Sequence, residues 1–234
     1  MNEAVSRLSE AVDEALSKLE VDAFGVASVA ELPAGRLREQ VLSLLPGARS
    51  IVALANEIYP EVLDHSKPDK LMGEASPRDM LVPHMDYLNG RLTKAAYDIA
   101  RSSRLQGFKA LPLPAANLPS DQRFLAAILS YKHAAEAAGL GTIGRHSLLV
   151  TRRFGPRVRL ACVLTEAELA PTPRITKRLC SACNRCIEAC PSRALSVPSD
   201  GEAYSINKFA CNAFRSGAGP CSECMKACPF GREK

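Results

Sequence analysis

The sequence predicts an α/β domain over residues 1–175, followed by a small cysteine-rich domain over residues 176–234. In the first part, apolar runs of strand length alternate with amphipathic helical patterns, which is typical of layered α/β folds. Eight of the nine cysteines lie in the last quarter of the chain, where they recur at short spacings. The proline-containing stretch 171–178 separates the two parts, so we expect the domain boundary there.

The first elements are predicted to be a helix, a strand, a second helix and a second strand. Residues 3–20 carry apolar side chains three and four positions apart, which indicates an amphipathic helix. Residues 23–27 and 50–55 are short apolar runs that predict buried strands. Between them, residues 36–45 have a helical pattern that ends before Pro46.

The middle of the chain is predicted to contain a long loop and two further helices. Residues 59–83 are rich in charges and prolines and indicate a loop, and loops of this length are usually functional or disordered. A helix follows from Met85 to about Leu105, and a strand follows residue 107, with Pro112 as its limit. Residues 121–138 are alanine-rich and are predicted to be helical.

Three glycines, Gly139, Gly141 and Gly144, have the spacing G-x-G-x-x-G of a dinucleotide-binding fingerprint. That fingerprint needs a strand before the glycines and a helix after them. Here a helix precedes and the strand-like stretch 147–151 follows, so a dinucleotide site is disfavoured. Glycine lets a backbone turn sharply or approach a large ligand closely, and the alternative is a plain turn from helix to strand.

A strand is predicted over residues 158–164, and Cys162 lies within it between apolar neighbours. We therefore expect Cys162 to be a buried core thiol. Five arginines surround this part of the chain, and a charge run of this kind usually forms a solvated face, with a phosphate partner as the alternative. They are Arg145, Arg152, Arg153, Arg157 and Arg159.

Composition narrows the class of protein. With 47% hydrophobic and 24% charged residues, the chain is typical of globular proteins. The net charge of +5 is too small to indicate nucleic-acid binding. The first residues lack a signal-peptide pattern, and no apolar run approaches the roughly 20 residues that span a bilayer. We therefore expect a cytoplasmic protein without a membrane partner.

The cysteines form two arrays, Cys180-x2-Cys183-x2-Cys186-x3-Cys190-Pro191 and Cys211-x9-Cys221-x2-Cys224-x3-Cys228-Pro229. An iron–sulfur cubane needs four thiolates, and two-residue gaps let one loop supply three of them. In two-cluster ferredoxins, the cysteine before the proline binds the other cluster. The expected ligand sets are therefore Cys180, Cys183, Cys186 and Cys228 for one [4Fe–4S] cluster, and Cys190, Cys211, Cys221 and Cys224 for the second.

Two other uses of these cysteines are disfavoured. Zinc sites usually take separated C-x2-C pairs, which the triple spacing does not match. A disulfide framework needs an oxidising compartment, which nothing in the sequence indicates. We therefore expect the cysteine-rich domain to carry electrons one at a time.

Three stretches resemble one family. Residues 138–149, Ala-Gly-Leu-Gly-Thr-Ile-Gly-Arg-His-Ser-Leu-Leu, resemble the AGLGWIGKNxLL segment of epoxyqueuosine reductases and their reductive-dehalogenase relatives. Residues 154–169 look like the segment that follows it in those proteins. The cysteine array, including the wide gap between Cys211 and Cys221, is similar to their two-cluster ferredoxin module.

The resemblance implies a nitroreductase-like α/β core followed by a ferredoxin-like domain with two [4Fe–4S] clusters. It also implies a cobalamin, held base-off between them and reduced through the clusters, with flavin as the less favoured cofactor. In such proteins the corrinoid does the difficult chemistry while the protein supplies binding, orientation and a proton. The implied cofactor-binding residues are Gly139, Gly141 and Gly144 at the corrinoid, with Arg145 and His146 near its polar edge.

The implied catalytic residues are Asp86 and Tyr87. Epoxyqueuosine reductases carry a G-x-D-Y-H motif, and the matching stretch here, residues 84–88, keeps its aspartate and tyrosine but not its glycine and histidine. The aspartate would donate a proton, and we expect its pKa to be raised by burial if it does. The alternative is an ordinary solvated charge.

The expected function is that of a reductase acting on a small or nucleoside-like substrate, with a ferredoxin or flavodoxin as its low-potential electron donor. The helical repeats that follow the ferredoxin module in many epoxyqueuosine reductases are not seen after Cys228, so a tRNA substrate is possible but not favoured. The alternatives are an electron-transfer protein without its own substrate, and a protein that reduces a corrinoid for another enzyme.

Overall fold

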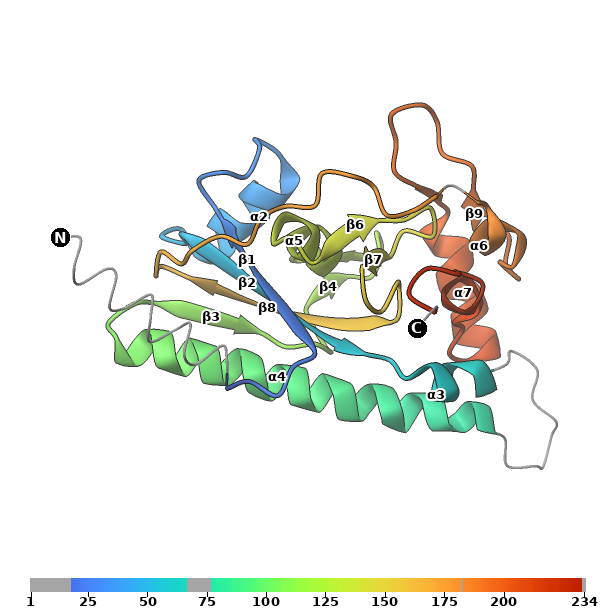
Figure 1. Ribbon diagram of the computed structural model, residues 1–234, viewed down its shortest axis with the longest axis horizontal. Coiled ribbons are helices and arrows are strands. Elements are labelled where there is room, and N and C mark those ends of the chain that lie inside the picture. The colour runs from blue at the N-terminus through green and yellow to red at the C-terminus, as the bar shows by residue number, and fades with distance from the viewer. Residues whose placement is uncertain (1–17, 67–76, 182, 233–234) are drawn as a thin grey trace. The chain divides into compact units, whose positions relative to one another are not determined.

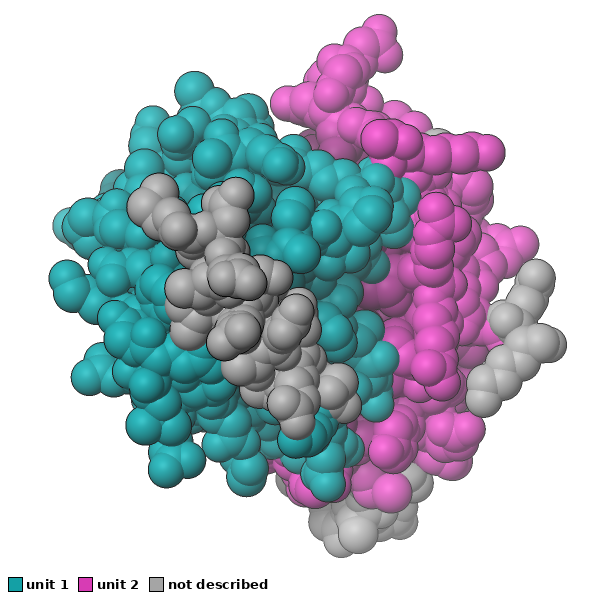
Figure 2. All heavy atoms as spheres, turned by 60° about the vertical axis from the view of Figure 1, so that its left-hand side comes forward, with its two compact units in different colours: residues 1–56, 89–140, 159–175 teal, residues 57–88, 141–158, 176–234 magenta. Residues whose placement is uncertain are grey.

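The computed structural model describes residues 18–66, 77–181 and 183–232. The chain divides into two compact units, coloured separately in Figure 2. Unit 1 comprises Met1–Asn56, Asn89–Leu140 and Arg159–Ile175, and unit 2 comprises Glu57–Leu88, Gly141–Val158 and Thr176–Lys234. One of these limits falls after residue 175, where the sequence predicts a boundary, but unit 2 also takes in two earlier stretches. The two-domain division stays a prediction.

Unit 1 contains one four-stranded sheet, and the two strands at each edge of that sheet run antiparallel to each other. The strand order is β1, β2, β8 and β3, with β1 antiparallel to β2 and β3 antiparallel to β8. The strands are β1 (Ala23–Ser28), β2 (Ser50–Glu57), β3 (Ala110–Leu113) and β8 (Val158–Thr165). These strands confirm the four predicted from apolar runs. Pro112 lies inside β3, which its place at the edge of the sheet allows because proline lacks an N–H for pairing.

Helices cover both faces of this sheet. The long helix α4 (Leu81–Leu105) packs Leu92, Ala96 and Ile99 against Val52 and other buried strand residues. Figure 1 shows α2 (Arg36–Leu44) and α5 (Tyr131–Ala137) on the opposite face. The architecture is therefore a mixed α/β one, as the sequence predicts.

Residues 121–130 are not helical, which contradicts the helix predicted over residues 121–138. They include a short hairpin of β4 (Ser120–Asp121) and β5 (Ala126–Ala127), and only α5 keeps the predicted helix. The Asp121 carboxylate accepts a hydrogen bond from the backbone N–H of Arg123 at 2.9 Å and pairs with its guanidinium. Such side-chain contacts with the backbone favour turns over helices. The chain then passes through Leu125 in a left-handed conformation, with φ at 45°.

Unit 2 consists of short elements and contains a small apolar core of Ile58, Leu63, Leu81 and Leu88. Its elements are α3 (Pro60–His65), the 3₁₀ helix η1 (Pro77–Met80), the hairpin β6 (Gly141–Ile143) and β7 (Leu149–Thr151), α6 (Arg185–Glu188), the hairpin β9 (Leu195–Ser196) and β10 (Ser205–Ile206), α7 (Lys208–Ala218) and α8 (Glu223–Lys226).

The prediction of a loop over residues 59–83 is wrong at both ends of this range, where the structure shows helices. Pro60 begins α3 and Pro77 begins η1, since proline is well accepted at the first position of a helix. Helix α4 begins at Leu81, so Pro83 falls in its first turn, where its missing N–H has no helical partner to lose. Residues 67–76 lie outside the described part, as does nearly all of the helix predicted over residues 3–20. None of the described helices is both long and apolar enough to cross a membrane.

Candidate iron–sulfur site

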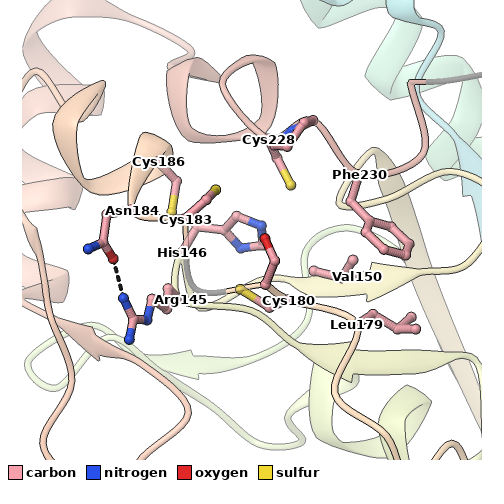
Figure 3. Close-up of a pocket in the computed structure, with 12 residues that line it drawn as sticks. Arg145, His146, Val150, Leu179, Cys180, Cys183, Asn184, Cys186, Cys228 and Phe230 are labelled. Carbon is pink, nitrogen blue, oxygen red and sulfur yellow. Dashed lines mark hydrogen bonds between the residues drawn. The ribbon is translucent and has the colours of Figure 1, made fainter.

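Four cysteines line one pocket of unit 2, although one of them comes from a separate part of the sequence. Cys180, Cys183 and Cys186 come from the segment around α6, and Cys228 follows α8 (Figure 3). These are the four ligands that the cysteine spacing predicts for one cluster. The other lining residues are Arg145, His146, Val150, Leu179, Ser181, Asn184, Pro229 and Phe230.

Local backbone contacts bring the first three cysteines into the pocket. The backbone N–H of Leu179 donates to the hydroxyl of Thr142 in β6 at 2.9 Å, which fixes the chain just before Cys180. Asn184 then adopts a left-handed conformation, with φ at 64°, as the N-cap of α6. Asparagine accepts this conformation more readily than most residues. The chain therefore turns sharply between Cys183 and Cys186, and α6 buries the Cys186 thiol.

The thiols of this set influence one another. Burial, and after it the negative charges of Cys180, Cys228 and Cys183, together raise the pKa of Cys186 to about 11. Burial also raises the pKa of Cys228, whereas the N–H of Phe230 and the positive charge of Arg157 lower it. Iron binds thiolates, not thiols. A cluster at this place would supply the positive charge that four crowded thiolates need.

The second predicted set shows the same mutual influence. Burial first, and then the charges of Cys221, Cys211, Cys186 and Cys190, together raise the pKa of Cys224 to about 12. Cys211 likewise has a raised pKa, because of burial first and then of Cys190 and Cys221, although Arg215 acts against them. Cys190 is thus close to cysteines of the second array, as the crossed ligand sets require, and Cys186 is near enough to Cys224 to link the two sets.

Cys190 differs from Cys186, Cys211, Cys224 and Cys228 in the direction of its pKa shift. Burial raises its pKa, but hydrogen bonds to the sulfur outweigh that effect and the pKa is lowered. The Ser192 hydroxyl lies 3.5 Å from Sγ, and the backbone N–H of Ala194 donates to it at 3.3 Å. Hydrogen bonds of this kind stabilise a thiolate and are one of the means by which proteins adjust cluster potentials.

No three Cys, His, Asp or Glu side chains in the described ranges converge on a point that a single metal ion could occupy. A cubane does not require that geometry, because each of its four irons takes one thiolate. The shared pocket and the mutual charge effects of the cysteines are the features that fit a [4Fe–4S] cluster.

Arg145 and His146 line the same pocket as the cysteines. A guanidinium nitrogen of Arg145 donates a hydrogen bond to the side-chain oxygen of Asn184, which lies between Cys183 and Cys186. His146 is buried, and its Nδ1 accepts a hydrogen bond from the backbone N–H of Leu148 at 3.1 Å. The structure therefore brings two of the five predicted cofactor-binding residues, Arg145 and His146, to the first cysteine set. Their contact with a corrinoid stays a prediction.

At each of the three glycines, a Cβ would come too close to other atoms of the chain. A Cβ at Gly141 would overlap the carbonyl of Val150, and a Cβ at Gly144 would press against the His146 ring. Gly139 has φ at +77° and faces the carbonyl of Pro173. The chain's own close packing therefore accounts for glycine at all three positions, which fits the plain-turn alternative. Their role at a cofactor stays a prediction.

Asp86 and Tyr87 do not line the pocket. Both lie in α4 with exposed side chains, and Tyr87 keeps 58% of its surface accessible. The burial expected of a proton-donating Asp86 is absent in this structure. The catalytic role of these two residues stays a prediction.

Sequence reasoning missed one residue of unit 2. Arg157 was assigned to a solvated arginine face, and this is wrong because only 1% of its surface is accessible. Arg152 and Arg153 are exposed, whereas Arg159 is partly buried and donates to the side chain of Asn89 at 2.8 Å. The five arginines therefore do not form one face. The only local sign of burial in the sequence was the apolar stretch that begins at Val158.

Comparisons with known proteins agree with the site. A family model described as a 4Fe-4S binding domain matches residues 173–196. A tetrachloroethene reductive dehalogenase from Desulfitobacterium hafniense is 37% identical over 115 residues, which cover 41% of this chain and 21% of the relative. An epoxyqueuosine reductase from Prochlorococcus marinus (strain NATL2A) is 33% identical over 82 residues, covering 35% of this chain and 24% of the relative. The matches therefore span a fifth to a quarter of these relatives.

Solved structures with the same fold cover nearly all of this chain. An epoxyqueuosine reductase from Streptococcus thermophilus superposes with a TM-score of 0.63 at 17% identity, covering 100% of this chain and 67% of the other. A catabolic reductive dehalogenase superposes with a TM-score of 0.71 at 19% identity, covering 96% and 32%. The chain is therefore a relative of the epoxyqueuosine reductases and the reductive dehalogenases, and it carries a 4Fe-4S binding domain.

Proposed function

We propose that this chain is a cytoplasmic iron–sulfur oxidoreductase that passes electrons through two [4Fe–4S] clusters to a base-off cobalamin, which reduces a small or nucleoside-like substrate. The observation that carries the proposal is the pocket in unit 2, where Cys228 lies with Cys180, Cys183 and Cys186. Two arrays that are separate in the sequence thus contribute to one site, as crossed cluster ligation requires. A ferredoxin or flavodoxin is the proposed electron donor.

The residues of this chain would hold the clusters and set their surroundings. Each cluster, when bound, supplies electrons one at a time. The two sets of four cysteines would provide the thiolates, and the burial of Cys186 limits the access of water to the first set. Arg145 and His146, which line the first pocket, place a positive charge and a polar ring beside it.

The corrinoid and the substrate class are proposed from the relatives. One structural neighbour is a reductive dehalogenase described with a mechanism for B12-dependent dehalogenation, with a TM-score of 0.70 at 21% identity. Another is an epoxyqueuosine reductase with a modified tRNA stem loop, with a TM-score of 0.57 at 21% identity. These neighbours support a cobalamin and a small or nucleoside-like substrate, and Asp86 with Tyr87 would supply the proton.

The experiment is a metal analysis of protein purified without oxygen from cells given cobalamin. We expect about eight irons per chain, from two four-iron clusters, with the absorption bands of base-off corrinoid and about one cobalt. Zinc in place of iron, or about four irons after full reconstitution, would contradict the two-cluster part. Eight irons without cobalt would contradict the corrinoid part of the proposal and would agree with the electron-transfer part.

A second candidate function is electron transfer without a substrate of its own. It is favoured by the exposed positions of Asp86 and Tyr87. It is also favoured by the three glycines, whose close contacts are with other atoms of the chain. A tight, stoichiometric corrinoid would count against it. Product from added tetrachloroethene or epoxyqueuosine would distinguish a reductase from a protein that reduces a corrinoid for another enzyme.

A further inference from the structure

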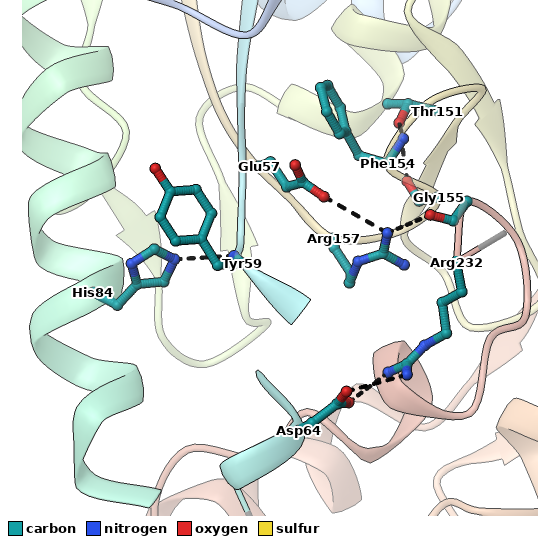
Figure 4. Close-up of polar contacts among 10 residues, drawn as sticks. Glu57, Tyr59, Asp64, His84, Thr151, Phe154, Gly155, Arg157 and Arg232 are labelled. Carbon is teal, nitrogen blue, oxygen red and sulfur yellow. Dashed lines mark hydrogen bonds and ion pairs between the residues drawn. The ribbon is translucent and has the colours of Figure 1, made fainter. Parts of the chain in front are cut away.

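Arg157 carries a buried positive charge, and the described residues around it pair with only part of its guanidinium group. Its Nη2 donates to the carbonyl oxygen of Gly231 at 2.6 Å and lies 3.7 Å from Oε1 of Glu57 (Figure 4). Its Nε and Nη1 are buried and have no hydrogen-bond partner among the described residues. A buried cation is costly unless it is paired and hydrogen-bonded, so further negative charge near this guanidinium would be favourable.

The contact with Gly231 places Arg157 on the segment that follows Cys228. This segment packs closely on the turn before Arg157, because a Cβ at Gly155 would overlap the carbonyl of Phe230. A Cβ at Gly231 would in turn overlap the backbone at Gly155. Substitution of either glycine would therefore push the two segments apart. The guanidinium of Arg157 joins them by a hydrogen bond.

The same segment is held on its other side. Arg232 donates to both carboxylate oxygens of Asp64 in α3, at 2.8 and 3.4 Å. Phe230, two residues after Cys228, lines the cysteine pocket. The path of residues 228–232 is thus fixed by contacts to α3 and to the turn before Arg157. Cys228 is the remote member of its predicted ligand set and depends most on such contacts.

The charge of Arg157 lies beside the segment that carries Cys228. Its buried guanidinium is hydrogen-bonded to the carbonyl oxygen of Gly231, three residues after Cys228. Uptake of one electron adds one negative charge to a cluster and moves no proton or bond. A buried positive charge nearby stabilises the more negative state, and it does so more strongly than an exposed charge because water screens it less.

We propose that Arg157 is a positioning residue for the cluster of the first ligand set: it holds the Cys228 segment in place, and its charge raises the reduction potential of that cluster. The inference rests on the proposed function, because it requires the two clusters. It assigns to Arg157 a role toward the cluster and not toward the substrate.

Three variants separate the hydrogen bond from the charge. Arg157→Gln removes the charge, and Arg157→Lys keeps it on a side chain that lacks the planar guanidinium. Arg152→Gln is the matched control, because it removes the same charge from an exposed site in the same segment. Each protein is loaded with clusters without oxygen, and its iron content is measured first.

The first measurement is a redox titration with dithionite, followed by electron paramagnetic resonance. The cluster of the first set is identified as the one whose resonance Cys180→Ala removes. We expect Arg157→Gln to make reduction of that cluster at least tenfold less favourable, which is about 59 mV for a one-electron couple. Arg157→Lys and Arg152→Gln should stay near the native potential, and the other cluster should change less.

The second measurement is the rate at which an iron chelator removes iron from the loaded protein. We expect both Arg157 variants to lose the first cluster faster than the native protein and the Arg152→Gln control. A loaded Arg157→Gln protein with the native potential would overturn the charge role. If Arg157→Gln cannot hold the cluster, the test uses Arg157→Lys instead. Iron release at the native rate in Arg157→Lys would overturn the positioning role. Failure of the native protein to take up clusters would instead count against the proposed function.

Discussion

The hydroxyl of Ser222 donates a hydrogen bond to the hydroxyl of Ser66 at 3.2 Å, and both side chains are buried. Ser222 lies between Cys221 and Cys224, and Ser66 directly follows α3. The ammonium group of Lys226 in α8 also donates to the backbone carbonyl of Ser66. The end of α3 therefore anchors the segment that carries two of the predicted ligands of the second cluster.

Ser66→Ala should weaken this anchor. The substitution removes a buried hydrogen bond and leaves the Ser222 hydroxyl without it, which costs about 1 to 3 kcal/mol of unfolding free energy. For a chain of this size the melting temperature should fall by about 2 to 4 °C for each kcal/mol. Thermal unfolding followed by circular dichroism measures the change.

Ser216→Ala is the control for this substitution. Ser216 donates to the carbonyl of Asn212 within α7, but it is exposed, so water can replace the lost bond. We expect little change in its melting temperature. Equal melting temperatures for Ser66→Ala and Ser216→Ala would show that the buried bond does not anchor α8.

His84 should make stability depend on pH. Its Nε2 accepts a hydrogen bond from the backbone N–H of Tyr59 at 3.1 Å, which requires an unprotonated nitrogen (Figure 4). Burial lowers the pKa of His84. In the unfolded chain the imidazole binds its proton at a higher pH, near 6.5, so stability should fall as the pH drops below about 6.5. Above that value the group is neutral in both states and contributes no pH dependence.

The difference between the native protein and His84→Gln isolates this effect, because glutamine does not titrate. Melting temperatures from pH 8 to 5.5 should converge for the two proteins at low pH. His65→Gln, at an exposed histidine of α3, should leave the native profile unchanged. Parallel profiles for native protein and His84→Gln would rule out the contribution of His84.

Cys162 should be inert and unnecessary for the clusters. It is fully buried in β8, and burial raises the pKa of its thiol. Because the thiolate is the reactive form, iodoacetamide should not label Cys162 at pH 8 until the protein unfolds. Cys162→Ala should keep the native iron content. Labelling of the folded protein, detected by peptide mass spectrometry, or loss of iron in the variant would contradict its assignment as a core thiol.

Asp86→Asn tests the predicted proton donor. Because Asp86 is exposed, the substitution should change stability by no more than about 0.5 kcal/mol. If Asp86 supplies the proton, turnover of an accepted substrate should be lost while iron and corrinoid contents stay native. Glu61→Gln, an exposed acid in α3, provides the control. Unchanged turnover in Asp86→Asn would show that Asp86 does not supply the proton.

Much of the fold and the cluster site could be predicted from local pattern. Continuous apolar runs predicted β2 and β8, because a strand buried on both faces has little choice of residue. The spacing of the cysteines predicted the grouping of Cys228 with Cys180, since cluster geometry limits how four thiolates can be shared. The two strands are confirmed because their signal lay within a few neighbouring residues. Cys228 does lie in one pocket with Cys180, but their assignment as ligands of one cluster stays a prediction.

The remaining features depend on contacts that the sequence does not display. Asp121 turns the chain by bonding the backbone N–H of Arg123, which overrides the alanine-rich helical pattern. Arg157 is buried because of a partner 74 positions later, the carbonyl of Gly231, and no local pattern reports that. Helix α3 has only six residues and buries Leu63 in the apolar core of unit 2, a contact that its largely polar sequence does not reveal.

The central claim is that the two cysteine arrays share their ligands across two clusters. Its most direct test compares Cys228→Ala and Cys190→Ala with alanine variants of Cys180 and Cys211, by iron analysis and electron paramagnetic resonance of the reduced proteins. We predict that Cys228→Ala loses the same cluster resonance as Cys180→Ala, and that Cys190→Ala loses the same one as Cys211→Ala. If Cys228→Ala instead loses the resonance that Cys211→Ala loses, the ligand sets are not crossed and the account is contradicted.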